Sequence, residues 1–152
     1  MKKTMLLWIS LIVFSGLSAQ KLNEKDGMYY NTDGTAFSGD IQEKYDNGTV
    51  KMTASVEAGL LQGEVFFYTP DGLLAEKGNY ASGKKHGTWI QYNLKGSKTG
   101  EAHYMNGQKD GIWTIWDDNG VKRYHMVYAM GKKIDVWKMW DENSNLVSER
   151  VY

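Results

Sequence analysis

The middle of the chain contains the pattern Tyr80-x-x-Gly83-x-x-x-Gly87-x-Trp89-x-x-Tyr92. It recurs as Tyr104-x-x-Gly107-x-x-x-Gly111-x-Trp113-x-x-Trp116. The two copies are 24 residues apart at every matched position. A fixed period of about 20–50 residues is typical of repeat architectures, in which each repeat is one supersecondary unit. The sequence therefore predicts a repeat protein.

The same register runs through most of the chain. Glycine is 17 of 152 residues, too few for several aligned columns to arise by chance. The glycine columns are Gly39, Gly63, Gly87 and Gly111; Gly48, Gly72, Gly96 and Gly120; and Gly59, Gly83, Gly107 and Gly131. Asp135 and Ser144 replace glycine near the end. We therefore expect one domain of about five repeats over 27–152, degenerate at both ends.

Residues 1–19 have the pattern of a secretory signal peptide. Lys2 and Lys3 precede an apolar run over 5–14, and small residues lead to Ala19. We expect cleavage after Ala19, a flexible leader over 20–26, and a periplasmic, cell-surface or secreted protein. A retained anchor is the alternative, because Leu17 makes the cleavage site imperfect.

The remaining composition excludes several classes of partner. Without Lys2 and Lys3 the chain has 16 basic and 18 acidic residues, whereas binding of nucleic acid calls for a basic face. The chain has no cysteine, so it forms no disulfide. After Ala19 no apolar stretch approaches the roughly 20 residues of a transmembrane helix.

Each repeat is predicted to contain two strands and two turns. Aromatic and β-branched residues between glycines favour strands over helices. Asn47-Gly48, Asp71-Gly72 and Asn119-Gly120 are dipeptides typical of two-residue type I′ turns. The segments Gly59 to Gly63, Gly83 to Gly87 and Gly107 to Gly111 are predicted to be longer loops. The predicted fold is all-β: consecutive antiparallel hairpins in one elongated, twisted meander sheet.

Side-chain alternation along the strands predicts two sets of aromatic residues on opposite faces. One set is a structural ladder of tryptophan and tyrosine: Trp89, Trp113, Trp137, Tyr80, Tyr104 and Tyr128. The other is a candidate binding face: Tyr68, Tyr92, Trp116 and Trp140. The alternative for this second set is a packed interior, which would arise if the sheet coiled around it.

Five lysines occupy the inter-repeat loops and are predicted to form a candidate basic edge: Lys84, Lys85, Lys109, Lys132 and Lys133. A solvated edge that discourages aggregation is one interpretation. A contact stripe for phosphate headgroups or an acidic partner is the other.

The Tyr-x-x-Gly-x-x-x-Gly-x-Trp-x-x-Tyr pattern resembles the MORN repeat, in its bacterial variant form, over about residues 27–152. Proteins with such repeats are often grouped with a YwqK-type antitoxin family. The resemblance implies β-hairpins in an elongated sheet, a scaffolding, membrane-associated or partner-binding role, and no catalysis. The tryptophan and tyrosine repeats also resemble, more loosely, cell-wall-binding modules that hold glycans in aromatic cages.

No residues suggest catalysis or a resident cofactor or metal. The three histidines occupy different positions of the repeat, and no nucleophile, phosphate-binding or zinc motif is present. We expect a non-enzymatic, exported module that binds another protein or scaffolds at the cell envelope. The alternatives are an antitoxin or immunity protein and a module that binds glycan or lipid headgroups.

Overall fold

The computed structural model describes residues 21–152, and all regular structure within that range is β. The predicted signal peptide over 1–19 lies outside the described residues. The strands in residues 21–152 are β1 (Asn23–Lys25), β2 (Met28–Tyr30), β3 (Gly39–Lys44), β4 (Val50–Glu57), β5 (Leu60–Tyr68), β6 (Leu74–Ala81), β7 (Lys84–Tyr92), β8 (Lys98–Met105), β9 (Gln108–Trp116), β10 (Lys122–Ala129), β11 (Lys132–Trp140) and β12 (Leu146–Val151).

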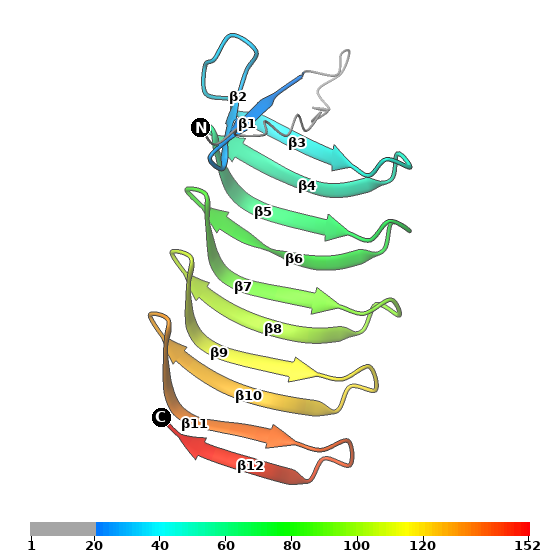
Figure 1. The fold of residues 1–152 in the computed structure, drawn as a ribbon, viewed down its shortest axis with the longest axis vertical. Helices are drawn as coiled ribbons and strands as arrows, with labels where there is room; N and C mark the ends of the chain where they lie inside the picture. Colours follow the sequence, from blue (N-terminus) through cyan, green and yellow to red (C-terminus); the bar gives the residue numbers. More distant parts are fainter. Residues whose placement is uncertain (1–20) are drawn as a thin grey trace, which may run out of the picture.

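Strands β3 to β12 form one open antiparallel sheet in which each strand pairs with its neighbours in sequence. Figure 1 shows the resulting hairpins stacked one below another, from β3 to β12. Strands β5, β7, β9 and β11 start at residues 60, 84, 108 and 132, so the period of the sequence is also the period of the structure. The predicted meander of consecutive hairpins is confirmed.

The turns within repeats differ from the prediction. The Gly48 N–H donates to the Tyr45 carbonyl, and the Tyr45 N–H donates to the Thr49 carbonyl, both at 2.9 Å. Gly48 has a φ of 85°, whereas Asn47 keeps a negative φ. This is a three-residue loop, a type I turn followed by a left-handed glycine, and not a type I′ turn. The turns at Gly72 and Gly120 repeat the same hydrogen bonds.

The connections between repeats, predicted to be longer loops, are the tight turns. Ser82 and Gly83 have φ values of 48° and 74°, and Ala81 pairs directly with Lys84 across them. Positive φ at both central residues is the type I′ conformation. Gly87 lies inside β7, where it has a φ of 70° beside an irregular register with β6. In Figure 1 the long strands bend near their start, which is where this glycine column lies.

The segment predicted to be a flexible leader, over 20–26, contains a strand in this structure. Residues Asn23–Lys25 form β1, which pairs with β2, and the Leu22 side chain is 3% exposed. Backbone hydrogen bonds attach β2 to the turn between β4 and β5: the Tyr29 N–H donates to the Gly59 carbonyl at 2.8 Å. The sequence interpretation missed this hairpin because Leu22 and Tyr29 belong to no 24-residue column. Their common role is packing against the sheet, which is visible only in the folded structure.

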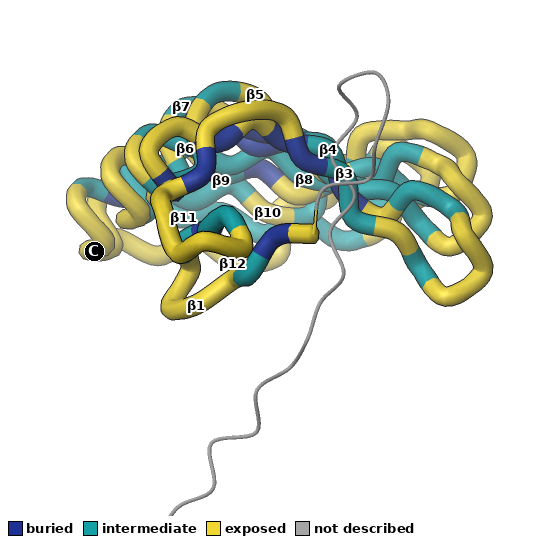
Figure 2. The backbone as a smooth tube through the Cα atoms, turned by 90° about the horizontal axis from the view of Figure 1, so that it is seen from above, coloured by how far each residue is buried: buried dark blue, intermediate teal, exposed yellow. Residues whose placement is uncertain are grey.

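The densest core lies where the β1–β2 segment covers one face of the sheet. Its buried side chains come from the covering segment and from β3 to β7: Leu22, Tyr29, Phe37, Ile41, Met52, Ala54, Val56, Val65 and Trp89. Figure 2 shows that the sheet is arched and that β1 lies under the arch. One face is therefore covered at the N-terminal end of the stack.

Trp89 is the largest fully buried side chain, and a glycine makes room for it. An ideal Cβ on Gly78 would lie 2.2 Å from the Trp89 ring, which is too close for any real contact. Gly78 has no positive φ, so this glycine is required by packing and not by backbone conformation.

Gly78→Ala is expected to lower the free energy of unfolding by about 1–3 kcal/mol, because the added methyl overpacks the core against the indole ring. Urea unfolding followed by tryptophan fluorescence measures the change. Gly100→Ala is the matched control, because its Cβ would meet only the flexible Gln91 side chain, at 3.0 Å. Equal losses in the two variants would contradict this account of Gly78.

Burial of the Tyr29 phenol, with nearby Glu43 and Glu24, raises its pKa to about 12. The unfolded chain releases this proton near pH 10, so the contribution of Tyr29 to stability is full below pH 10 and is lost as the pH rises toward 12. We expect the native protein to lose about 2–3 kcal/mol over that interval through this residue. Tyr29→Phe should flatten this part of the stability–pH curve, measured by urea unfolding from pH 8 to 12; an unchanged slope would exclude Tyr29 as the cause.

Candidate aromatic binding surface

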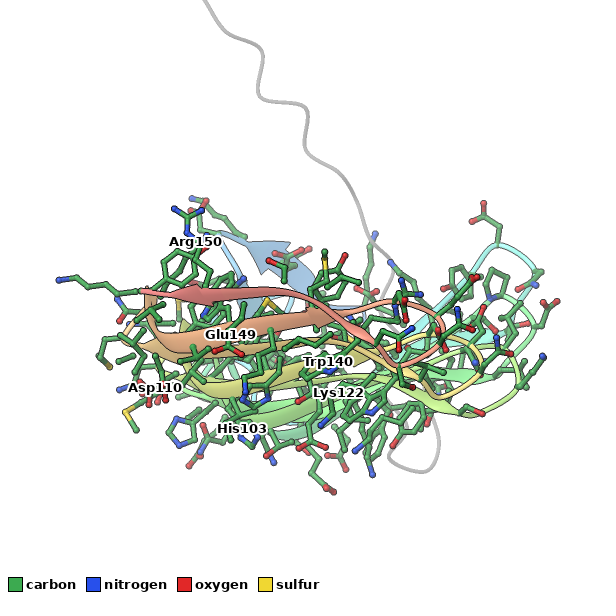
Figure 3. The ribbon with its side chains drawn as sticks, turned by 90° about the horizontal axis from the view of Figure 1, so that it is seen from below. His103, Asp110, Lys122, Trp140, Glu149 and Arg150 are labelled. Atoms are coloured by element: carbon green, nitrogen blue, oxygen red, sulfur yellow. The ribbon has the colours of Figure 1, made fainter. Side chains whose placement is uncertain are left out.

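The tryptophan and tyrosine columns lie on the face of the sheet that β1–β2 covers. Trp89 pairs with Ala102 on β8, and Ala102 pairs with Trp113 on β9, so the two indoles are on the same side. We call this side the ladder face. Figure 3 shows Arg150, which pairs with Trp137, on the side where β1 lies, and His103 and Trp140 toward the other side.

The rings form one continuous series of contacts. The ring-centre distances are 5.3 Å for Tyr80–Trp89, 6.2 Å for Trp89–Tyr104, 5.1 Å for Tyr104–Trp113, 5.5 Å for Trp113–Tyr128, 5.0 Å for Tyr128–Trp137 and 4.7 Å for Trp137–Tyr152. All six pairs are tilted or edge-to-face, the arrangement that aromatic quadrupoles favour. Each tryptophan thus packs between tyrosines of successive repeats.

Each indole also has a backbone hydrogen bond that repeats with the period. The Trp89 Nε1–H donates to the Asn79 carbonyl at 3.1 Å, and Trp113 and Trp137 donate to the carbonyls of His103 and Val127 at 3.0 Å. These bonds satisfy the only polar atom of each ring and fix its orientation. Burial raises the pKa of the Tyr80 and Tyr104 phenols, and the nearby Glu76 carboxylate contributes in both cases.

The five lysines of the predicted basic edge divide into two groups. The ammonium of Lys85 lies 3.5 Å from the Trp89 ring centre, that of Lys109 lies 4.1 Å from Trp113, and that of Lys133 lies 4.5 Å from Trp137. These three lysines extend over the ladder face. Lys84 and Lys132 start their strands and are exposed. The lysines of the predicted edge therefore lie at the same end of the sheet but point to opposite faces, because consecutive strand residues alternate between faces. The contact role of this edge stays a prediction.

The predicted binding row of Tyr68, Tyr92, Trp116 and Trp140 lies on the opposite face and is half-buried. Its members are two strands apart, and no ring contact joins them within the described part of the chain. Lys98 lies 4.5 Å from the Trp116 ring centre and donates a hydrogen bond to Glu101 at 2.7 Å, which lowers the pKa of that carboxyl. The binding role of this row stays a prediction.

A second apolar row is open to solvent on the C-terminal half of the ladder face. Ile115 pairs with Tyr124, and Tyr124 pairs with Met139. The side chains of Ile115 and Tyr124 are 39% and 41% exposed. We call Trp113, Ile115, Tyr124 and Met139 the open ladder surface. Sequence reasoning missed it because only Ile115 and Met139 share a 24-residue column, and Tyr124 joins them by pairing across strands.

The β9–β10 repeat, which carries Trp113, Ile115 and Tyr124, has a known counterpart. Residues 109–129 match the MORN repeat variant family. The matched segment is most of the β9–β10 hairpin, so the MORN repeat corresponds to one hairpin of the sheet. MORN repeats serve as protein- and membrane-interaction modules, which is compatible with a binding role. No curated protein matches the chain.

The described residues include no cluster of His, Asp or Glu that could hold a metal ion. Across residues 21–152 no helix is long and apolar enough to cross a membrane. The arrangement offers aromatic rings, aliphatic side chains and ammonium groups in a row, which is suited to noncovalent recognition.

Lys109→Gln is expected to lower the free energy of unfolding by about 0.5–1 kcal/mol, because the neutral amide loses the attraction of the ammonium to the Trp113 and Tyr128 rings. Thermal and urea unfolding measure the difference. Lys132→Gln is the control, because Lys132 is exposed at the start of β11. A loss as large in the control would show that general charge, and not contact with the rings, is responsible.

Proposed function

We propose that this protein is an exported, non-enzymatic module that binds another protein at the cell envelope and serves there as an adaptor or scaffold. The main support for the proposal is the exposed part of the ladder face. The ladder face is covered at one end by the chain's own β1–β2 segment, and it bears exposed aromatic and aliphatic side chains at the other end. A surface of this composition is typical of the centre of protein interfaces.

Two further features support the proposal. The pattern of residues 1–19 favours export, and the repeated hairpins form an elongated sheet on which one partner can contact several repeats. An antitoxin or immunity function of the YwqK type would use the same kind of surface. The identity of the captured protein distinguishes these roles: a toxin favours the immunity function, and an envelope component favours the scaffold.

The test is cross-linking in intact cells, followed by capture of a C-terminally tagged full chain and mass spectrometry. We expect one reproducible protein partner from the envelope fraction, and a captured chain that starts at Gln20. Ile115→Ser combined with Tyr124→Ser should reduce recovery of the partner about tenfold or more, because exposed apolar anchors dominate binding energy.

Trp116→Ala combined with Trp140→Ala is the comparison variant, because these residues lie on the opposite face. If only this variant loses the partner while it remains folded by circular dichroism, the row predicted from the sequence is the binding face. Recovery of lipid or polysaccharide without any protein from the wild-type chain would contradict the proposed function.

A further inference from the structure

Three lysines on the ladder face repeat one arrangement. Each ammonium lies close to a tryptophan ring and to the tyrosine ring that follows it along the ladder. Lys85 lies 3.5 Å from the centre of the Trp89 ring and 5.3 Å from that of Tyr104. The corresponding distances are 4.1 Å and 4.8 Å for Lys109 with Trp113 and Tyr128, and 4.5 Å and 4.8 Å for Lys133 with Trp137 and Tyr152. The rings hold the side chains in place, so little rotamer entropy remains to be lost when an anion binds.

Within residues 21–152, Lys85 is the one of these three lysines that has a carboxylate partner. The Glu76 Oε1 atom lies 3.4 Å from the Lys85 Nζ atom, and Glu76 is on the ladder face because it pairs with Gln91. The corresponding positions in the next two repeats are Gly100 and Tyr124. Among residues 21–152 no ion pair involves Lys109 or Lys133.

We propose that Lys109 and Lys133 bind two carboxylates of an acidic, extended segment of a partner protein, in the way that Lys85 binds Glu76. This inference rests on the proposed function and adds the chemistry of the partner. The two lysines are two strands apart, about 10 Å at the usual strand spacing. Ile115 and Tyr124, exposed on the same face, supply apolar contact for the partner's neighbouring side chains.

The shape of the sheet favours a protein segment over a membrane surface. The ladder face is the side that β1–β2 covers, and Figure 2 shows β1 under the arch of the sheet. A flat bilayer would meet the outer side of the arch first, whereas a narrow chain can lie along the inner side. The carboxylate of Glu76 is, in addition, a protein ligand already bound to the first lysine.

The repeat suggests a substitution that would give Lys109 a carboxylate partner from the chain itself. Gly100→Glu places a carboxylate where Glu76 stands in the preceding repeat. The substitution is compatible with the backbone because Gly100 has no positive φ, and the nearest atom to its Cβ is the flexible Gln91 Oε1 at 3.0 Å. Gly100→Gln has the same size without the charge and is the matched control.

The experiment measures binding of a fluorescent peptide of repeating Glu-Leu-Pro triplets to the full chain by anisotropy at low salt. Such a peptide favours the polyproline II helix, which displays one Glu about every 9 Å along one side. A Gln-Leu-Pro peptide is the uncharged control probe. We expect the acidic probe to bind and the control probe to bind much more weakly.

Gly100→Glu, Lys109→Gln and Lys133→Gln should each weaken binding of the acidic probe about fivefold, which corresponds to loss of one exposed ion pair. Gly100→Gln and Lys132→Gln should leave binding unchanged, and thermal unfolding verifies that every variant is folded. Failure of the acidic probe to bind, or equal weakening by Gly100→Glu and Gly100→Gln, would overturn the inference.

Binding of vesicles containing phosphatidylglycerol that depends on Lys109 and Lys133, without binding of the peptide, would also overturn it in favour of a lipid ligand. Capture of an envelope protein tests the proposed function independently of peptide binding. If the Lys109→Gln/Lys133→Gln variant still captures the envelope protein, the carboxylate inference fails and the proposed function stands. If the wild-type chain captures no protein, the proposed function fails whatever the peptide does.

Discussion

Stacking of tryptophan against tyrosine across neighbouring strands joins the hairpins of this sheet into one stable stack. A single β-hairpin buries little surface and is marginally stable in water. Here each indole contacts tyrosine rings from adjacent repeats, so a hairpin gains most of its apolar contact only when a neighbour is present. Burial of one large aromatic side chain contributes about 2–3 kcal/mol, and the ladder repeats that contribution along the sheet.

This arrangement places strict demands on the backbone. The rings of successive repeats meet only if every hairpin has the same length and bend, and the glycines with positive φ at the turns and at the strand bends maintain both. Asp135 and Ser144 adopt the same positive φ without being glycine, with values of 61° and 65°. The register of the repeat therefore continues in the last hairpin, although its sequence has diverged.

The ladder face is covered at the N-terminal end of the stack and exposed at the C-terminal end. Toward the N-terminus Leu22, Tyr29 and Phe37 complete a core against it. Toward the C-terminus the same face bears exposed Ile115 and Tyr124, together with lysines held by aromatic rings and not by carboxylates. One architecture thus has a covered core in one half and an exposed apolar and basic surface in the other, because each repeat changes only a few side chains.

The sequence alone determined the repeat, its period, the antiparallel hairpins and the columns that form the ladder. These features follow from local rules, because the side-chain alternation of a strand and the turn preference of glycine act over a few residues. The type I′ turns lie between repeats, at Ser82-Gly83, and not within repeats, at Asn47-Gly48. The sequence does not indicate this, because serine has no general preference for the positive φ that Ser82 adopts. Which apolar residues are covered follows from tertiary packing, because the β1–β2 segment covers the face of the sheet at one end of the stack. The open ladder surface depends on pairing between strands, and its exposure depends on how far β1–β2 extends, so no spacing along the chain reveals either.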